Sequence, residues 1–259
     1  MEDEIRLLGK IIREGDVVFD IGANVGTHSI AFSRMVGASG KVFAFEPQPS
    51  VAQLLVTTID LNGLSNIEVV QSVVCESGTK RFKLDLEDKE RIAGNQAGVS
   101  FTNMEIPEGE IPSISLDQLV PLAPKLLKID AEGMEVNVIK CAIYINSTSS
   151  TAIYTENHER KFSIPLLRAL FDLNYICYWH LVPAFHPDNF LRQTEDIWGG
   201  HGFNINMLCL PKESNVPLEG LIRVQSETEW IDDRIRIDYS QDMSKHRIPI
   251  ESVSGLDFL

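Results

Sequence analysis

The chain has 259 residues, of which 44% are hydrophobic and 23% charged, a composition typical of globular proteins that bury a large core. Lysine and arginine number 23 against 37 aspartate and glutamate residues, giving a formal net charge of −14. Such an excess of negative charge disfavours nucleic acids and anionic membrane surfaces as partners.

The cellular setting is expected to be cytoplasmic. The first fifteen residues are rich in charge, so they lack the apolar core of a signal peptide, and no apolar run approaches the ~20 residues that span a bilayer. The four cysteines are widely spaced and include no C-x-x-C pair, which favours reduced packing residues over disulfides or a metal site.

Along the first third of the chain, apolar spacing predicts an α/β alternation. A helix is expected over 4–13, where apolar residues recur at helical intervals. The elements that follow are strands over 17–21, 41–45 and 67–74 and helices over 27–36 and 50–61. This βαβαβ order is typical of a parallel, doubly wound sheet with helices on both faces.

Beyond position 80 the pattern weakens and then returns. A half-exposed strand is predicted over 81–86, and the polar segment 88–112 is a candidate loop or lid. Later elements are strands over 126–130, 151–155, 175–182 and 206–210 and helices over 132–144 and 164–173.

These elements predict one main domain. We expect a leading helix over 1–14, a domain over 15–212 with insertions at 87–113 and 182–204, and a C-terminal extension of unknown role over 213–259.

The turn after the first strand has the composition of a nucleoside-binding site. Asp20, Gly22, Asn24 and Gly26 form a D-x-G-x-N-x-G pattern, in which the glycines allow positive φ and the polar side chains suit an ammonium and a carboxylate. Glu46 ends the second strand, twenty residues after Gly26, where a carboxylate can accept both ribose hydroxyls. These five residues are the predicted cofactor ligands.

An NAD(P)-binding Rossmann protein is the main alternative for this turn. A dinucleotide site needs G-x-G-x-x-G to place a helix N-terminus against the pyrophosphate. The chain has Asp20 at the first of those positions, where a carboxylate would repel a pyrophosphate. The pattern therefore favours a phosphate-free cofactor with an amino-acid end, namely S-adenosylmethionine.

The sequence resembles the FkbM-type methyltransferases. The resemblance rests on the blocks F-D-I-G-A-N-V-G at 19–26, F-E-P at 45–47 and L-K-I-D-A-E-G-M-E at 127–135, of which the last is distinctive. It implies a Rossmann-like, seven-stranded, mostly parallel sheet of the class I methyltransferase kind. It also implies S-adenosylmethionine as methyl donor, S-adenosylhomocysteine as product, and O-methylation of a hydroxyl on a sugar or small natural product.

Candidate catalytic residues follow the fourth and fifth predicted parallel strands. An alcohol acceptor needs a base near the methyl donor, and Asp130, Glu132 and His158 lie where those strands end. For the two acids the alternative role is capping of the next helix, and for the histidine it is structural packing. Lys128 lies within a buried strand and is expected to pair with a carboxylate.

A metal requirement is the less favoured reading of the same region. Asp130, Glu132, Glu156 and His158 could together hold a hard divalent cation, but they form no recognised metal-binding motif. We therefore expect no resident metal.

The aromatic insertion before the last strand is the candidate acceptor site. His186, Asn189 and Trp198 offer hydrogen-bonding groups among aromatic rings, a surface suited to sugars and planar metabolites. The alternatives are a hydrophobic plug over the sheet edge or a homodimer contact. A non-catalytic S-adenosylmethionine-binding protein also remains open from the sequence.

Overall fold

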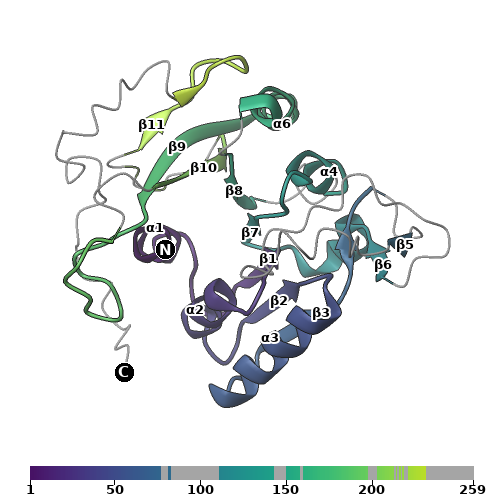
Figure 1. Cartoon of the computed structure of the whole chain (residues 1–259). Helices are drawn as coiled ribbons and strands as arrows, with labels where there is room; N and C mark the ends of the chain where they lie inside the picture. The colour runs from purple at the N-terminus through teal and green to yellow at the C-terminus, as the bar shows by residue number, and fades with distance from the viewer. Residues whose placement is uncertain are drawn as a thin grey trace, which may run out of the picture. The chain divides into compact units, whose positions relative to one another are not determined.

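The structure is a computed structural model of the whole chain, drawn in Figure 1. The residues it describes are 1–76, 81–82, 111–142, 150–157, 160–197, 203–212, 214, 216, 218 and 221–231. The chain divides into two compact units, one comprising Arg13–Thr151 and the other Met1–Ile12 with Ala152–Leu259. The predicted domain over 15–212 extends into both units.

The unit Arg13–Thr151 is built on a parallel sheet. Its strands lie in the order β7-β1-β2-β3, with β1 at Val17–Ile21, β2 at Lys41–Phe45, β3 at Ile67–Val70 and β7 at Leu126–Ile129. The strands β1 and β7 are buried along almost their whole length, and β1 pairs with β7 on one edge and with β2 on the other. The predicted parallel βαβαβ order is confirmed.

Two helices connect these strands and begin and end at residues suited to those places. Helix α2 (Thr27–Val36) begins after Gly26, which has φ +94°, and is followed by Gly37 with φ +63°. Helix α3 (Pro49–Leu61) has proline in its first turn, where the missing N–H costs no hydrogen bond, and ends before Asn62.

The third predicted strand is divided in the structure. Residues 67–74 form β3 and then β4 (Val73–Val74), which belongs to a separate three-stranded sheet of order β4-β6-β5. Its partners are β5 (Arg81–Phe82) and β6 (Ile111–Ile114). Residues 111–113 of β6 lie within the predicted insertion, so the candidate loop over 88–112 ends in a strand, while the insertion itself stays a prediction. A 3-10 helix over Leu116–Leu122 and helix α4 (Glu135–Lys140) complete the described unit.

The described part of the other unit contains the strands β8, β9, β10 and β11 and the helices α1 and α6. Helix α1 (Glu2–Gly9) belongs to this unit, together with β8 (Ala152–Glu156) and α6 (Arg160–Asp172). Strand β10 (Phe203–Pro211) runs antiparallel to β8 on one side and to β9 (Tyr175–Pro183) on the other. The short strand β11 (Ile222–Arg223), which pairs with β9, was not predicted. None of the helices in the described ranges is long and apolar enough to cross a lipid bilayer.

Candidate cofactor and catalytic site

A pocket opens at the carboxyl ends of β1, β2 and β7 in the unit Arg13–Thr151. It has an empty volume of about 740 Å³, part of it open to solvent, which is the size of typical small-molecule sites. The wall combines three carboxylates with a run of apolar side chains. The lining residues are Ile21, Gly22, Asn24, Phe45, Glu46, Pro47, Gln48, Ser72, Val73, Val74, Asp130, Ala131, Glu132, Met134 and Val138.

The turn after β1 is shaped by residues with positive φ. Gly22 has φ +76° and Asn24 has φ +51°, so the chain doubles back immediately after the strand. The backbone N–H of Gly22 donates to the carbonyl of Phe45 at 3.0 Å, which ties the turn to the end of β2. A Cβ on Gly22 would overlap the backbone carbonyl of Asp130, so only glycine fits where this turn meets the loop after β7. We call residues 21–26 the cofactor turn.

Glu46 lines the pocket and is hydrogen-bonded to the cofactor turn. It is 4% exposed, and its carboxylate accepts hydrogen bonds from the backbone N–H groups of Asn24 at 3.0 Å and Gln48 at 2.9 Å. Burial raises the pKa of Glu46, while these two hydrogen bonds act in the opposite direction. Each carboxylate oxygen keeps a further lone pair for a ligand hydroxyl.

The apolar wall was not identified from the sequence. Val73 and Val74 follow the polar pair at 71–72, and Met134 lies between the loop after β7 and helix α4. The polar residues at 71–72 could have indicated this wall. They end β3 at Val70, at the edge of the sheet where ligands bind, so that the residues after them border the pocket. A flat purine ring is a suitable occupant for such a wall.

Two predicted cofactor ligands, Asp20 and Gly26, do not line the pocket. Asp20 is fully buried; one carboxylate oxygen accepts from the hydroxyl of Ser29 at 2.6 Å, and the other is 3.3 Å from the ammonium of Lys128. Gly26 precedes α2, and a Cβ there would lie 2.5 Å from the side chain of Leu55. Neither residue is among those lining the pocket, so their direct contact with a cofactor stays a prediction. The expected carboxylate pairing of Lys128 is observed.

The two candidate catalytic acids line the pocket together. The side chain of Asp130 is 41% exposed, so a ligand can reach it, and its Oδ2 atom is 3.5 Å from Lys128 Nζ. Glu132 has φ +49°, a left-handed conformation that is uncommon for a residue with a Cβ and is often found at functional sites.

The loop that carries these acids is held by Glu135, which sequence reasoning did not single out. The Glu135 side chain folds back and accepts hydrogen bonds from the N–H groups of Ala131 at 3.2 Å and Gly133 at 3.1 Å. Burial raises the pKa of Glu135, against these backbone hydrogen bonds. The sequence feature that could have identified Glu135 is an acidic residue at the start of a helix.

The predicted acceptor residues belong to the other unit. His186 is 4% exposed, and its Nε2 atom is 2.7 Å from Arg6 Nη1 and 3.2 Å from Asp3 Oδ1. The amide group of Asn189 bonds within its own loop, to the backbone of His186 and Gln193. These contacts hold the loop together and against α1, so acceptor binding by either residue stays a prediction.

Two predicted site residues, His158 and Trp198, lie outside the described residues. The same holds for most of the predicted insertion over 87–113 and of the extension over 213–259. Among the side chains that the structure describes, no group of three His, Cys, Asp or Glu residues is arranged to hold a metal ion.

Comparisons with known proteins identify the family of the chain. The profile of the family described as "Methyltransferase FkbM domain" matches residues 20–177. Hexuronic acid methyltransferase AglP of Haloferax volcanii is 33% identical over 145 residues, which cover 54% of this chain and 55% of the relative. The chain thus spans about half the length of this curated relative.

Solved structures of methyltransferases share the fold. The precorrin-6y C5,15-methyltransferase of Geobacter metallireducens has a TM-score of 0.54 at 16% identity and covers 81% of this chain and 86% of its own. An S-adenosylmethionine-dependent O-methyltransferase of Thermotoga maritima has a TM-score of 0.50 at 16% identity and covers 83% and 66%. At such low identity these likenesses establish the fold alone, and they confirm the predicted Rossmann-like class I methyltransferase architecture. With more than half of its length matched by the family profile, the chain belongs to the FkbM methyltransferase family.

Proposed function

We propose that this protein transfers the methyl group of S-adenosylmethionine to a hydroxyl group of a sugar or small natural product. The observation that carries the proposal is the solvent-reachable carboxylate of Asp130, which lines the same pocket as the buried Glu46. One acid is placed to hold a cofactor and the other to meet an acceptor. Membership of a methyltransferase family supports S-adenosylmethionine as the cofactor.

The residues of the pocket fit that cofactor. Glu46 has lone pairs for the ribose hydroxyls, the apolar wall at Val73 and Val74 suits the adenine, and the cofactor turn offers backbone groups to the amino-acid end. Glu46 and Asp130 both oppose a pyrophosphate, which weighs against a dinucleotide. When bound, S-adenosylmethionine supplies an electrophilic methyl group.

Asp130 is the proposed base. A hydroxyl oxygen is a weak nucleophile until its proton is withdrawn, and a carboxylate within hydrogen-bonding distance can accept that proton as the new oxygen–carbon bond forms. Most of the remaining acceleration comes from holding the acceptor in line, so the loop over 130–135 must be rigid. The hydrogen bonds from Ala131 and Gly133 to Glu135 supply that rigidity.

A sugar acceptor is supported by the curated relative. That protein is described as a hexuronic acid methyltransferase and matches this chain at 33% identity over 145 residues. A sugar acid offers both hydroxyl and carboxylate oxygens, and the negatively charged pocket rim at Asp130 and Glu132 favours a neutral hydroxyl as the reacting group.

Labelled methyl transfer tests the proposal. The full chain would be incubated with methyl-labelled S-adenosylmethionine and a panel of hexuronic acids, their glycosides and the matching neutral hexoses. A base-stable methyl ether is the expected product, because an ether survives mild alkali and a methyl ester does not. Asp130→Asn should reduce turnover about 100-fold or more while leaving the affinity for S-adenosylhomocysteine within threefold, in the range of general-base contributions. Undiminished turnover would remove Asp130 from the mechanism.

Thermal shift separates the alternatives that the sequence left open. Ligand binding to the folded state raises the melting temperature. A shift with S-adenosylhomocysteine and none with NAD is expected, and the reverse would overturn the methyltransferase proposal. Tight binding without transfer to any member of the panel would support a non-catalytic binding protein.

A further inference from the structure

Lys128 is a buried cation at the junction of the cofactor turn and the catalytic loop. It lies on β7, in direct register with Asp20 of the neighbouring strand β1, and its side chain is only 6% exposed. An ammonium group removed from water needs close partners to offset the lost hydration. The partners of Lys128 therefore indicate its role.

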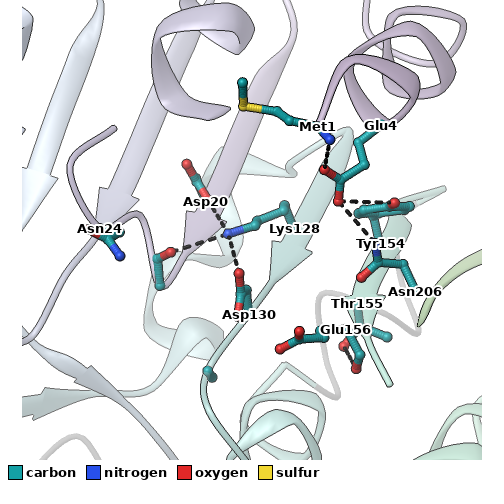
Figure 2. Close-up of polar contacts among 12 residues, drawn as sticks. Met1, Glu4, Asp20, Asn24, Lys128, Asp130, Tyr154, Thr155, Glu156 and Asn206 are labelled. Carbon is teal, nitrogen blue, oxygen red and sulfur yellow. Dashed lines mark hydrogen bonds and ion pairs between the residues drawn. The ribbon is translucent and has the colours of Figure 1, made fainter. Parts of the chain in front are cut away.

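Three contacts of the Lys128 ammonium join different parts of the site, and the carboxylates of Asp20 and Asp130 that face it are drawn in Figure 2. Its Nζ atom donates to the backbone carbonyl of Gly22 at 3.2 Å, in the cofactor turn. It is 3.3 Å from Asp20 Oδ1, at the end of β1, and 3.5 Å from Asp130 Oδ2, on the pocket wall.

The two carboxylates beside Lys128 have different surroundings. Asp20 is fully buried, and its other oxygen is engaged by the hydroxyl of Ser29 on α2, so it serves as a fixed anchor for the ammonium. Asp130 is 41% exposed and directly follows β7, two residues after Lys128. One side of the ammonium is therefore fixed in the core, and the other meets a carboxylate that a ligand can reach.

Backbone packing places the same segments in contact independently of Lys128. Gly22 lies so close to the backbone of Asp130 that a Cβ would overlap its carbonyl, and the N–H of Asp130 donates to the carbonyl of Ile21 at 3.0 Å. The cofactor turn and Asp130 are therefore in direct backbone contact.

Resting on the function proposed above, we infer that Lys128 is a positioning residue that fixes the cofactor turn through the Gly22 carbonyl and orients the Asp130 carboxylate for the acceptor. The ammonium group couples cofactor binding to the placement of the base. Asp20 acts one step further away, by holding Lys128.

The test compares a charge-retaining variant with a charge-free pair. Lys128→Met alone would leave Asp20 as an unpaired buried charge, so the informative variant is the double change Asp20→Asn/Lys128→Met, which removes both charges together. Lys128→Arg keeps the cation in a bulkier form. If the double variant does not fold, Asp20→Asn/Lys128→Gln, which keeps polar groups at both positions, replaces it. A surface ion pair on β2 and β3 provides the matched control, because Lys41 Nζ is 2.6 Å from Glu68 Oε2. The control variant is Lys41→Met/Glu68→Gln.

Calorimetric binding of S-adenosylhomocysteine to the full chain is the first readout. We expect Lys128→Arg to bind within about threefold of the original protein and the charge-free pair to bind about tenfold more weakly, as for loss of one charge-assisted hydrogen bond. A purely structural role predicts the opposite order, because a compact uncharged pair fits a buried site better than the larger, charged arginine. The opposite order, or equal binding by all variants, would overturn the inference.

Methyl transfer to the hexuronic acid panel is the second readout. The charge-free pair should lose more in kcat than in KM for the acceptor, and Lys128→Arg should recover part of kcat. If the original protein binds S-adenosylhomocysteine but methylates nothing, the proposed function fails while the binding comparison still decides the role of Lys128.

Discussion

The carboxylate of Glu46 accepts a hydrogen bond at 3.0 Å from the backbone N–H of Asn24, 22 residues earlier in the chain. This contact joins the ends of β1 and β2 through a side chain that is nearly fully buried. Burying a carboxylate opposes its ionisation, and the pKa of Glu46 is raised mainly for that reason. Ionisation of Glu46 therefore lowers the stability of the ligand-free chain.

The substitution Glu46→Gln should separate stability from binding. A raised pKa means that the contribution of Glu46 to stability is present at low pH and is lost as the carboxyl ionises, so near pH 7 the charge destabilises the ligand-free protein. The variant should lose this pH dependence of stability, at the cost of one of the two backbone hydrogen bonds, because an amide has a single acceptor oxygen. It should bind S-adenosylhomocysteine about 10- to 100-fold more weakly, the range for losing hydrogen bonds to a charged group. Calorimetry and thermal melts measure both. An unchanged pH dependence of stability combined with unchanged affinity would contradict the assignment.

The helix-start acid Glu135 should matter through the loop that it holds. Glu135→Ala leaves the N–H groups of Ala131 and Gly133 without their acceptor and should destabilise the protein by about 1–3 kcal/mol. Glu135→Gln keeps an acceptor oxygen and should cost less. Denaturant unfolding measures the difference, and kcat for methyl transfer should fall in the same order. Equal stability of the two variants would show that the hydrogen bonds do not hold the loop.

The part of the site that could be predicted from sequence is the part encoded by local pattern. Short stretches of sequence are enough to recognise the apolar run over 17–21, the glycines after it and the acid at the end of β2. Glu46 and Asn24 line the pocket, as that pattern predicts. The helix over 27–36 has the predicted bounds because glycine lies on both sides of it.

The remainder depends on pairings between distant segments. The sequence pattern could not show that Asp20 lies beside Lys128, because a pattern does not give the register of β1 against β7. The break between β3 and β4 follows from pairing of Val73 and Val74 with a strand that begins at Ile111. Hydrophobic periodicity could not reveal that partner, because the polar segment before Ile111 masks the strand.

Charge in the pocket predicts a preference between the methyl donor and its product. The lining carboxylates are Glu46, Asp130 and Glu132, and S-adenosylmethionine carries one positive charge more than S-adenosylhomocysteine. Glu132→Gln should therefore weaken binding of the donor more than of the product, by about fivefold in the ratio, as for one partly exposed charge pair. Calorimetry at low and high salt checks this, because added salt should shrink the difference. Glu68→Gln, on β3 and half exposed, is the matched control and should leave the ratio unchanged.

The buried imidazole of His180 predicts a pH dependence of stability in the unit that contains β9. His180 is 2% exposed, its Nδ1 atom is 2.8 Å from the hydroxyl of Tyr154, and burial lowers its pKa to about 4. Between pH 6.5 and 4 the unfolded chain takes up a proton at this position while the folded chain does not. The free energy of unfolding should therefore fall over that window by up to about 3 kcal/mol.

Two variants isolate the contribution of His180. His180→Gln, which cannot titrate, should unfold with a shallower dependence on pH between 6.5 and 4 than the original protein, as measured by urea denaturation at several pH values. Tyr154→Phe removes the hydroxyl that contacts the ring but leaves it buried, so it should be less stable at every pH with the original slope. Because both variants keep the same carboxylates, acid titration elsewhere cancels in the comparison. If His180→Gln shows the original slope, then His180 takes up its proton in the folded chain as readily as in the unfolded one, and burial does not control its ionisation.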